Sequence, residues 1–428
     1  MQNPRIISAK ILQAILENKV FFSDLKQDVE EENRAFVNML VLSTLRNLVP
    51  LKKTLTNFLQ KKIAHKNRVV EYLLLLAIEE LLEMNTPDYA VLDTAVKNIR
   101  KQSDMFLANM ANAVLRNICR NLQQVKSDFF KMNKMPLSFK ELLQGYDKEQ
   151  IQRISRSIGQ IATIDLSVKN HPLEWAKKLD AKLLPNGSLR LINREKISSL
   201  EGYDQGSWWI QDVAASLPAL LAGNLSGKIV ADLCAAPGGK TAQLALTAKK
   251  VYAFDISALR LERLKENMLR LDLADKIEVI NTDSSQYFQD NSELKFDAIL
   301  LDAPCSATGT FRRHPEVLHI KTIDDVKSQV QTQKELLKAA ANALKPQGIL
   351  VYSVCSITKK EGEEQIQNFL AENQNFKIIP ITRAEVSPFG IWSDNFILKN
   401  GTVRTLPYYE QNIGGMDAFF VCKLQKIN

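Results

Sequence analysis

The amino-acid sequence is poor in the features that mark several special classes of protein. It contains only five Cys in 428 residues, an odd and widely spread set that argues against a disulfide framework and favours a reducing compartment. Its most apolar run, residues 72–78, is far shorter than the roughly 20 residues of a membrane-spanning helix. The N-terminus also lacks the apolar segment and cleavage site of a signal peptide. We therefore expect a cytoplasmic protein with no membrane segment.

Metal-binding patterns are missing as well. The four His residues are scattered, and no spacing of His or Cys suggests zinc, so we expect no metal. The hydrophobic fraction of 45% and the charged fraction of 24% are those of ordinary globular chains, which argues against disorder, collagen-like repeats and coiled coil. The formal net charge of +8 suggests a polyanionic partner such as a nucleic acid.

Residues 1–125 lack glycine altogether, and apolar residues such as Ile7, Ile11 and Ile15 recur there at helical spacing. The pattern predicts an all-α bundle over this range. Basic residues gather on it: solvated helix faces would explain any one of them, whereas the clusters favour a nucleic-acid surface equally well. The clustered residues are Lys52, Lys53, Lys61, Lys62, Lys66 and Arg68, and then Lys97, Arg100 and Lys101.

The rest of the chain divides into two regions of different character. Over residues 126–210, short strand-like segments at 161–168 and 188–192 flank a helical one at 172–179, which predicts a small α+β connecting domain. Over residues 211–428 strands and helices alternate, as in a doubly wound and mostly parallel α/β sheet. The expected strands are 228–233, 250–254, 276–280, 296–301 and 348–353, with a closing hairpin from 376–379 and 419–424.

The first of these strands runs into a glycine-containing loop before a helix. Gly238 and Gly239 allow the backbone to approach a ligand closely at the helix N-terminus. Neither the P-loop spacing nor the dinucleotide G-x-G-x-x-G spacing is present, so we expect a ligand that is held without a phosphate cradle. A tight turn that simply requires Gly is the structural alternative.

Four successive strands each bring an Asp to the same edge of the sheet, namely Asp232, Asp255, Asp283 and Asp302. Ligands of such sheets bind outside the carboxyl ends of the strands, and an acid about 20 residues after the glycine loop commonly accepts hydrogen bonds from a ribose. A solvated acid is the simpler interpretation of any single one. Together the four fit a nucleoside-like cofactor that carries a sulfonium or an amine.

Two of the five Cys follow neighbouring strands at this edge. Cys305 comes after the fourth expected strand and Cys355 after the fifth, where a thiolate can meet a substrate. A lone Cys is usually a small buried hydrophobe, and we keep that interpretation for Cys119 and Cys422.

These motifs resemble the Sun/Fmu-type RNA cytosine-5 methyltransferase family over nearly the whole chain, and residues 1–125 resemble its NusB-like RNA-binding domain. Three places depart from the family pattern: Val354 replaces a Thr, Ala307 stands where Gly is common, and residues 359–362 replace a Pro-Glu-Glu-Asn run. The motif blocks, in family order, are residues 208–212, 234–240, 302–305, 352–356 and 415–420.

The resemblance implies a C-terminal Rossmann-like methyltransferase domain, S-adenosyl-L-methionine as methyl donor, and a cytosine of small-subunit (16S) ribosomal RNA as substrate. It places Cys355 as the nucleophile and Cys305 as the residue that assists product release, with Asp302 near the donor and the target base. Cofactor-binding residues implied by the match are Cys234, Ala235, Ala236, Pro237, Gly238, Gly239 and Lys240 at the methionine end, Asp255 at the ribose and Asp283 near the adenine.

Two other functions stay open. A DNA cytosine-5 methyltransferase would need Cys305 but gives no reason for Cys355. A non-catalytic RNA-binding or assembly factor on a methyltransferase scaffold would not need both thiols together with the acidic residues. No sequence feature indicates an obligate protein partner.

Overall fold

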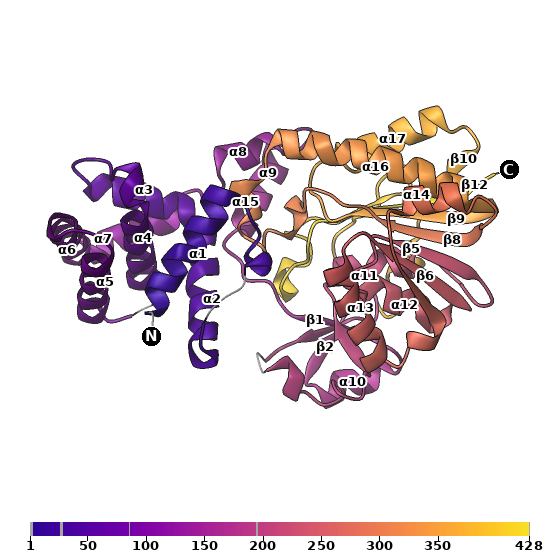
Figure 1. Cartoon of the computed structure of the whole chain (residues 1–428), viewed down its shortest axis with the longest axis horizontal. Coiled ribbons are helices and arrows are strands. Elements are labelled where there is room, and N and C mark those ends of the chain that lie inside the picture. Colours follow the sequence, from indigo (N-terminus) through magenta and orange to yellow (C-terminus); the bar gives the residue numbers. More distant parts are fainter. Residues whose placement is uncertain (1–2, 26–28, 85, 194–195, 428) are drawn as a thin grey trace. The chain divides into compact units, whose positions relative to one another are not determined.

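The structure is a computed structural model that describes residues 3–25, 29–84, 86–193 and 196–427 (Figure 1). Its contacts divide the chain into two compact units. The helical unit comprises Met1–Glu141, Tyr146–Gln160 and Phe311–Thr322, and the sheet unit comprises Leu142–Gly145, Ile161–Thr310 and Ile323–Asn428. The boundaries at 125 and 210 remain a prediction about which parts fold independently. No helix among the described residues combines the length and apolar character needed to cross a bilayer.

The helical unit is built around one buried helix, α4 (Arg68–Leu82), whose residues 72–82 are all shielded from water. Its two buried acids are satisfied: Arg5 pairs with Glu80 at 2.6 Å, and Asn47 donates to Glu79 at 2.9 Å. Burial raises the pKa of Glu79 to about 7. The glycine-free stretch is helical as predicted. The other helices are α1 (Pro4–Asn18), α2 (Glu31–Arg46), α3 (Leu48–Phe58), α5 (Asp88–Gln102), α6 (Met105–Arg120), α7 (Leu122–Lys131), α8 (Leu137–Glu141), α9 (Lys148–Ser157) and α15 (Val317–Ile320).

A late segment of the chain, Phe311–Thr322, belongs to the helical unit although it follows the 302–305 motif in sequence. Ile320 lies in the helical core, and the amide of Phe22 donates to the buried carboxylate of Glu316 at 3.2 Å. The ring Nε2 of His319 lies 2.8 Å from the carbonyl oxygen of Leu45, so it donates a proton there. Burial lowers the pKa of His319 to about 4.

His319 should make the helical unit sensitive to acid. The unfolded chain protonates this ring near its ordinary pKa, whereas the folded chain keeps it neutral down to about pH 4. Stability is therefore fully present above about pH 6.5 and is lost as the pH falls towards 4, by at most about 3 kcal/mol. His319→Gln keeps a donor for Leu45 without a titrating ring, so its thermal midpoint should fall less than that of the natural chain between about pH 7 and pH 5.

The control for this prediction is His65→Gln, which changes an exposed His of the same unit. It should leave the acid sensitivity of the natural chain in place. Circular dichroism melts of all three full-length chains provide the measurement. Parallel curves for His319→Gln and the natural chain would contradict the role given to His319.

The sheet unit contains a small antiparallel sheet with strand order β2-β3-β1-β4. A fully buried ion pair between Asp165 and Arg190, at 2.7 Å, joins β1 to β3. The 208–212 motif supports this sheet: Gln211 accepts from Ser167 at 2.8 Å, and Asp212 caps a helix by accepting from Ala214 at 2.9 Å. The motif is therefore structural here. The elements are β1 (Asp165–Val168), α10 (Pro172–Lys178), β2 (Ala181–Leu183), β3 (Leu189–Leu191) and β4 (Trp208–Ile210).

The large sheet has the strand order β10-β12-β9-β8-β5-β6-β7, parallel from β9 to β7 and closed by antiparallel β12. The predicted alternation is confirmed. The two closing segments pair antiparallel as β10 and β12, but they are not the expected hairpin, because β11 lies between them in the sequence and also pairs with β12. The strands are β5 (Ile229–Leu233), β6 (Lys250–Asp255), β7 (Ile277–Asn281), β8 (Phe296–Asp302), β9 (Leu344–Val354), β10 (Phe376–Ile378), β11 (Val403–Arg404) and β12 (Phe420–Lys426).

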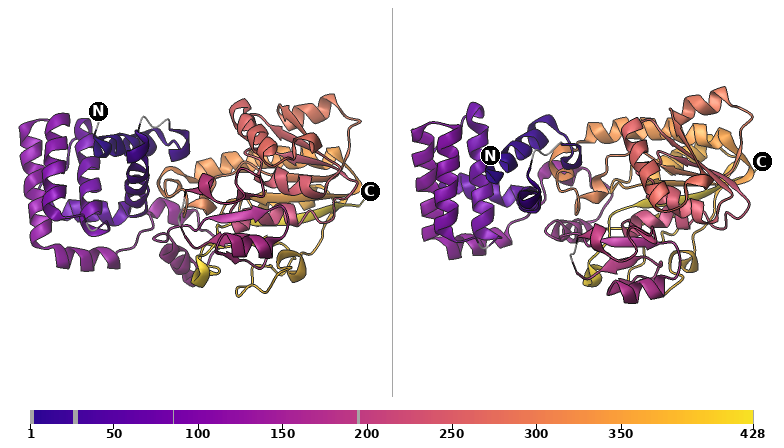
Figure 2. Two further views of the ribbon diagram at one scale, coloured as in Figure 1. Left: turned by 90° about the horizontal axis from the view of Figure 1, so that it is seen from below. Right: turned by 60° about the horizontal axis from the view of Figure 1, so that its bottom comes forward.

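Both faces of this sheet are covered by helices, as Figures 1 and 2 show. Successive residues of β8 enter opposite cores, because side chains alternate along a strand: Leu300 packs with α11, α12 and α13, and Leu301 with α14, α16 and α17. Two-sided burial explains the continuous apolar strands of the sequence. The helices are α11 (Val213–Leu220), α12 (Gly239–Thr247), α13 (Ala258–Arg270), α14 (Ser284–Asp290), α16 (Ile323–Ala343), α17 (Glu363–Glu372) and α18 (Arg383–Val386).

Candidate active site

The glycine loop connects β5 to α12 at the carboxyl edge of the sheet. Gly238 caps α12 with a φ of +104°, and an added Cβ would lie 3.0 Å from Leu264, so both conformation and space favour Gly. Asp255, at the end of β6, fixes the loop by accepting from the amide of Ala236 at 3.2 Å and from that of Ser257 at 2.9 Å. The loop backbone is thus fixed beside an acid.

The four aspartates do not share one environment. Asp232 is fully buried and accepts from Thr241 at 2.6 Å, and burial raises its pKa to about 7. Asp283 is exposed and caps α14 by accepting from the amide of Ser285 at 2.8 Å. Asp255 and Asp302 are the terminal residues of β6 and β8, the two neighbours of β5. They flank the glycine loop, whereas Asp232 is an internal support of it.

Asp302 is held by partners on both sides. Lys240, in the first turn of α12, pairs with one of its oxygens at 2.7 Å, and Ser353 of β9 donates to the other at 2.8 Å. The register of β8 and β9 sets Asp302 opposite Ser353. Lys240 and Ser353 therefore orient the carboxylate, which stays partly accessible, with 29% of its side chain exposed.

Cys305 and Cys355 lie together as the sequence predicts, because β8 and β9 are adjacent and parallel. Their sulfur atoms are 3.3 Å apart, within hydrogen-bond distance, and both are free thiols. The hydrogen bond with Cys355 and burial raise the pKa of Cys305 well above its ordinary value.

The other three thiols lie apart from this pair. Cys422 is fully buried in the sheet core and Cys119 packs against the helical core, as expected. Cys234, in the glycine loop, has a positive φ of 61°, and burial raises its pKa to about 12. It stays protonated at neutral pH.

Glu361 joins the two cysteine loops, and sequence reasoning missed it. Its fully buried carboxylate accepts from the amide of Ser306 at 2.7 Å, from the Ser306 hydroxyl at 2.6 Å and from Thr358 at 2.8 Å. Ser356 and Gln333 donate to the same carboxylate, the latter at 3.2 Å. Ser306 follows Cys305 and Ser356 follows Cys355, so one carboxylate sets the spacing of both thiols. The run of hydroxyl residues beside both Cys was the only available signal.

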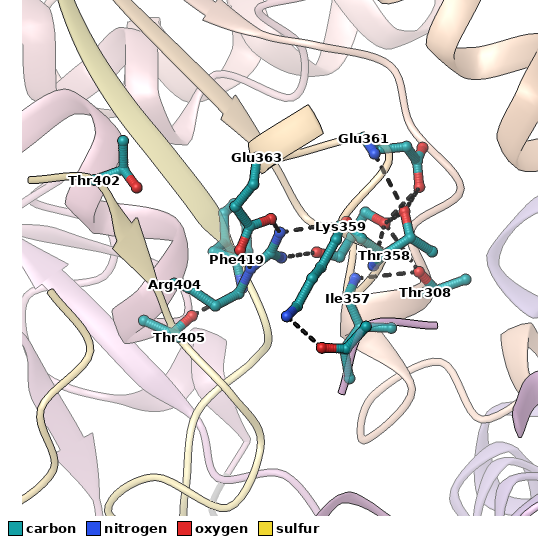
Figure 3. Close-up of polar contacts among 12 residues, drawn as sticks. Thr308, Ile357, Thr358, Lys359, Glu361, Glu363, Thr402, Arg404, Thr405 and Phe419 are labelled. Atoms are coloured by element: carbon teal, nitrogen blue, oxygen red, sulfur yellow. Dashed lines mark hydrogen bonds and ion pairs between the residues drawn. The ribbon is translucent and has the colours of Figure 1, made fainter. Parts of the chain in front are cut away.

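Residues 359–362 and Ala307, which depart from the family pattern, have defined local surroundings. Lys359 donates to the carbonyl of Gly145. A Cβ on Gly362 would overlap the guanidinium of Arg404. Figure 3 shows Lys359 and Arg404 beside the loop. Arg404 is buried, pairs with Glu363 and donates to the carbonyl of Thr358 at 3.3 Å, which fixes the loop after Cys355. Ala307 adopts a φ of +56°, the left-handed conformation that explains why Gly is common at its position.

The 415–420 motif also supports Cys355. The amide of Gly309 donates to the carbonyl of Cys355 at 3.0 Å, and the amide of Ala418 donates to the carbonyl of Gly309 at 3.0 Å. A Cβ on Gly309 would overlap the Ala418 oxygen, so only Gly allows this close approach. The motif therefore holds, through Gly309, the backbone of the candidate nucleophile in place.

The groups at the carboxyl edge of the sheet suit a nucleoside cofactor that carries a positive charge. Carboxylates at the ends of β8 and β6 flank a loop whose backbone leads into a helix N-terminus. Acceptors of this kind match an ammonium, a sulfonium and ribose hydroxyls better than phosphates. Within the described part of the chain, no cluster of three or more His, Cys, Asp or Glu residues is arranged to hold a metal ion.

Comparison with known proteins agrees with both units. The family described as 16S rRNA methyltransferase RsmB/F matches residues 220–425, and the NusB family matches residues 2–120. Ribosomal RNA small subunit methyltransferase B of Vibrio vulnificus is 32% identical over 88% of this chain and 93% of its own length. The protein of the same name from Pasteurella multocida is 29% identical over 99% of this chain and 96% of its own.

A solved structure, that of the protein PH0851, has the same fold, with a TM-score of 0.76 at 22% identity over 100% of this chain and 99% of its own. The fold, the site and these matches define an S-adenosylmethionine-dependent rRNA methyltransferase with a NusB-like N-terminal region. The chain belongs to the RsmB/F family of 16S rRNA methyltransferases.

Proposed function

We propose that the protein methylates C5 of a cytosine in small-subunit ribosomal RNA through a covalent adduct between Cys355 and C6 of the base. The observation that carries this proposal is the pair of free thiols, 3.3 Å apart, beside the acidic edge. C5 is a poor nucleophile, and an enzyme that methylates it must both activate the ring and remove a proton afterwards. Two thiols at one place supply a group for each step.

S-adenosyl-L-methionine, when bound, supplies an electrophilic methyl group on its sulfonium. The residues that would hold it are the backbone of the loop 234–240, with Asp255 for the ribose hydroxyls and Asp283 for the adenine. Asp302, paired with Lys240, would stand near the donor and the target base. Family likeness supports these roles, and the position of Asp255 against the loop agrees with them.

The first step is addition of the Cys355 thiolate to C6. The new S–C6 bond pushes electrons of the C5=C6 double bond onto C5, so that C5 could take the methyl group of a bound S-adenosylmethionine, which would leave as the neutral thioether. N3 takes a proton from solvent as the S–C6 bond forms and returns it when that bond breaks. Asp302 would accept a hydrogen bond from the protonated N3, which makes C6 more electrophilic. We give the attack to Cys355, as the family likeness does, because the pKa of Cys305 is raised and its thiolate is the less readily formed.

The second step is removal of the C5 proton, after which the S–C6 bond breaks and the double bond re-forms. We assign the removal of the C5 proton to Cys305, which must first give its own thiol proton to solvent. A thiol with a raised pKa forms the more basic thiolate, so Cys305 suits this role better than that of a nucleophile. Reduced thiols are required throughout, which supports a cytoplasmic location.

The target base must leave its stack to reach the thiols, which favours a loop or single-stranded RNA over a duplex. The lysine-rich helical unit would hold the phosphates. Ribosomal RNA as the substrate is supported by the names of the relatives and the family.

A tritium assay tests this function. Small-subunit ribosomal RNA labelled at C5 of cytosine is incubated with the protein and S-adenosylmethionine, and released tritium is compared with 5-methylcytidine in the digest. We expect equal amounts of both products. Methyl transfer without tritium release would place the methyl group on another atom. Cofactor binding without any transfer would favour a non-catalytic factor, and transfer to DNA a different substrate class.

A further inference from the structure

The helical unit contains a groove of about 780 Å³ between the end of α3, the segment 59–67 and α6. We call it the α3–α6 groove. Its floor is apolar, since Leu107 and Val114 are buried and Phe58 and Met110 are half-buried. The volume lies within the range of about 300–1,000 Å³ that is usual for small-molecule sites, which is enough for a nucleotide.

The rim of the groove is positively charged. Lys61, Lys62 and Lys66 line it, are exposed, and form no ion pair within the described ranges. The single acid in the lining, Asp104, accepts from the amide of Leu107 at 2.9 Å as the N-cap of α6. Three cations against one occupied carboxylate give the groove a surplus of positive charge, which suits a polyanion.

The same groove offers groups that recognise bases. Phe106 is 77% exposed on its wall, and a ring presented in this way can stack on a base. The side-chain amides of Asn67 and Asn109 also face the groove and make no hydrogen bond to any part of the chain that the structure describes. Amides of this kind can pair with the edges of unstacked bases.

We propose that the α3–α6 groove binds single-stranded RNA, with one unstacked base against Phe106 and the neighbouring phosphates on Lys61, Lys62 and Lys66. The proposal rests on the RNA substrate of the proposed function and assigns a particular site for it in the helical unit. A protein partner fits less well. Covering the groove would bury the lysine charges of its rim, which is costly unless the partner supplies anions to pair with them.

The test uses the full chain and a fluorescent single-stranded oligouridine of about ten nucleotides. Phe106→Ala should weaken binding about tenfold or more without changing its salt dependence, and Phe106→Tyr should restore it. Replacing Lys61, Lys62 and Lys66 by Ala should lower the slope of log affinity against log salt by about two. Tyr89→Ala is the matched control, since Tyr89 is 76% exposed on α5 outside the groove. The affinity of this variant for the oligouridine should equal that of the natural chain.

Photocrosslinking of a 4-thiouridine oligonucleotide gives a second readout, which we expect in the peptide containing Phe106. Natural affinity in both groove variants, with no crosslink in 59–67 or α6, would overturn the proposal and leave the groove to a protein. If the natural chain then still releases tritium from labelled RNA, only the groove is wrong. If groove variants lose RNA binding while the natural chain releases no tritium, the groove stands and the proposed chemistry fails.

Discussion

Cys305→Ala is expected to accumulate a covalent complex between the protein and its RNA. The variant retains Cys355, so it can add to C6 and transfer one methyl group, but it lacks the base that lets the S–C6 bond break. Turnover should fall by at least about 100-fold, and a band of protein plus RNA should survive denaturing electrophoresis. Mass spectrometry of the nuclease-trimmed complex should place the nucleotide on Cys355.

Cys355→Ala is the matched variant, and its expected result is the opposite one. Without the nucleophile, tritium release should fall by roughly 10⁴-fold or more and no covalent complex should form. Both changes remove one sulfur from the same pair, so differences between them report on role and not on packing. A covalent complex in Cys355→Ala, together with normal turnover in Cys305→Ala, would reverse the assignment.

Glu361→Ala is expected to lower the rate of methyl transfer by at least about 100-fold although Glu361 touches neither sulfur. Its carboxylate accepts hydrogen bonds from the residues that follow both Cys, so its loss releases both loops at once. A misplacement of about 1 Å is enough for a loss of this size. The buried donors left without an acceptor should also lower the free energy of unfolding by about 3 kcal/mol.

Two companion variants separate positioning from general damage. Glu361→Gln keeps one acceptor oxygen and should recover part of the activity, mainly in kcat and not in KM for S-adenosylmethionine. Glu364→Ala removes an exposed acid three residues further on and should behave like the natural chain. Natural kcat in Glu361→Ala, at a temperature where it remains folded, would show that the carboxylate does not position the thiols.

Local patterns in the sequence predict most of the sheet unit because each strand is buried on both faces and each helix presents one apolar face. Register then follows from topology, which is why the sequence already indicates that Cys305 and Cys355 lie together. The acidic edge is predicted less well. Sequence position alone cannot distinguish Asp302, which lines the site, from Asp232, which lies one residue inside the strand end and is sealed from water.

Contacts between distant segments are the part that sequence reasoning could not reach. Glu361 binds Ser306 across 55 residues of chain, and nothing in the local pattern marks that pairing. Phe311–Thr322 has the composition of an ordinary loop and short helix, yet it packs into the helical unit through Ile320 and His319. Side-chain partners of this kind depend on tertiary packing and not on periodicity.

Bisulfite mapping of small-subunit ribosomal RNA tests the central claim most directly. Cells that lack the protein should lose 5-methylcytosine at one or more positions. The natural chain should restore the modification and Cys355→Ala should not. An unchanged 5-methylcytosine pattern in the deletion strain would contradict the account.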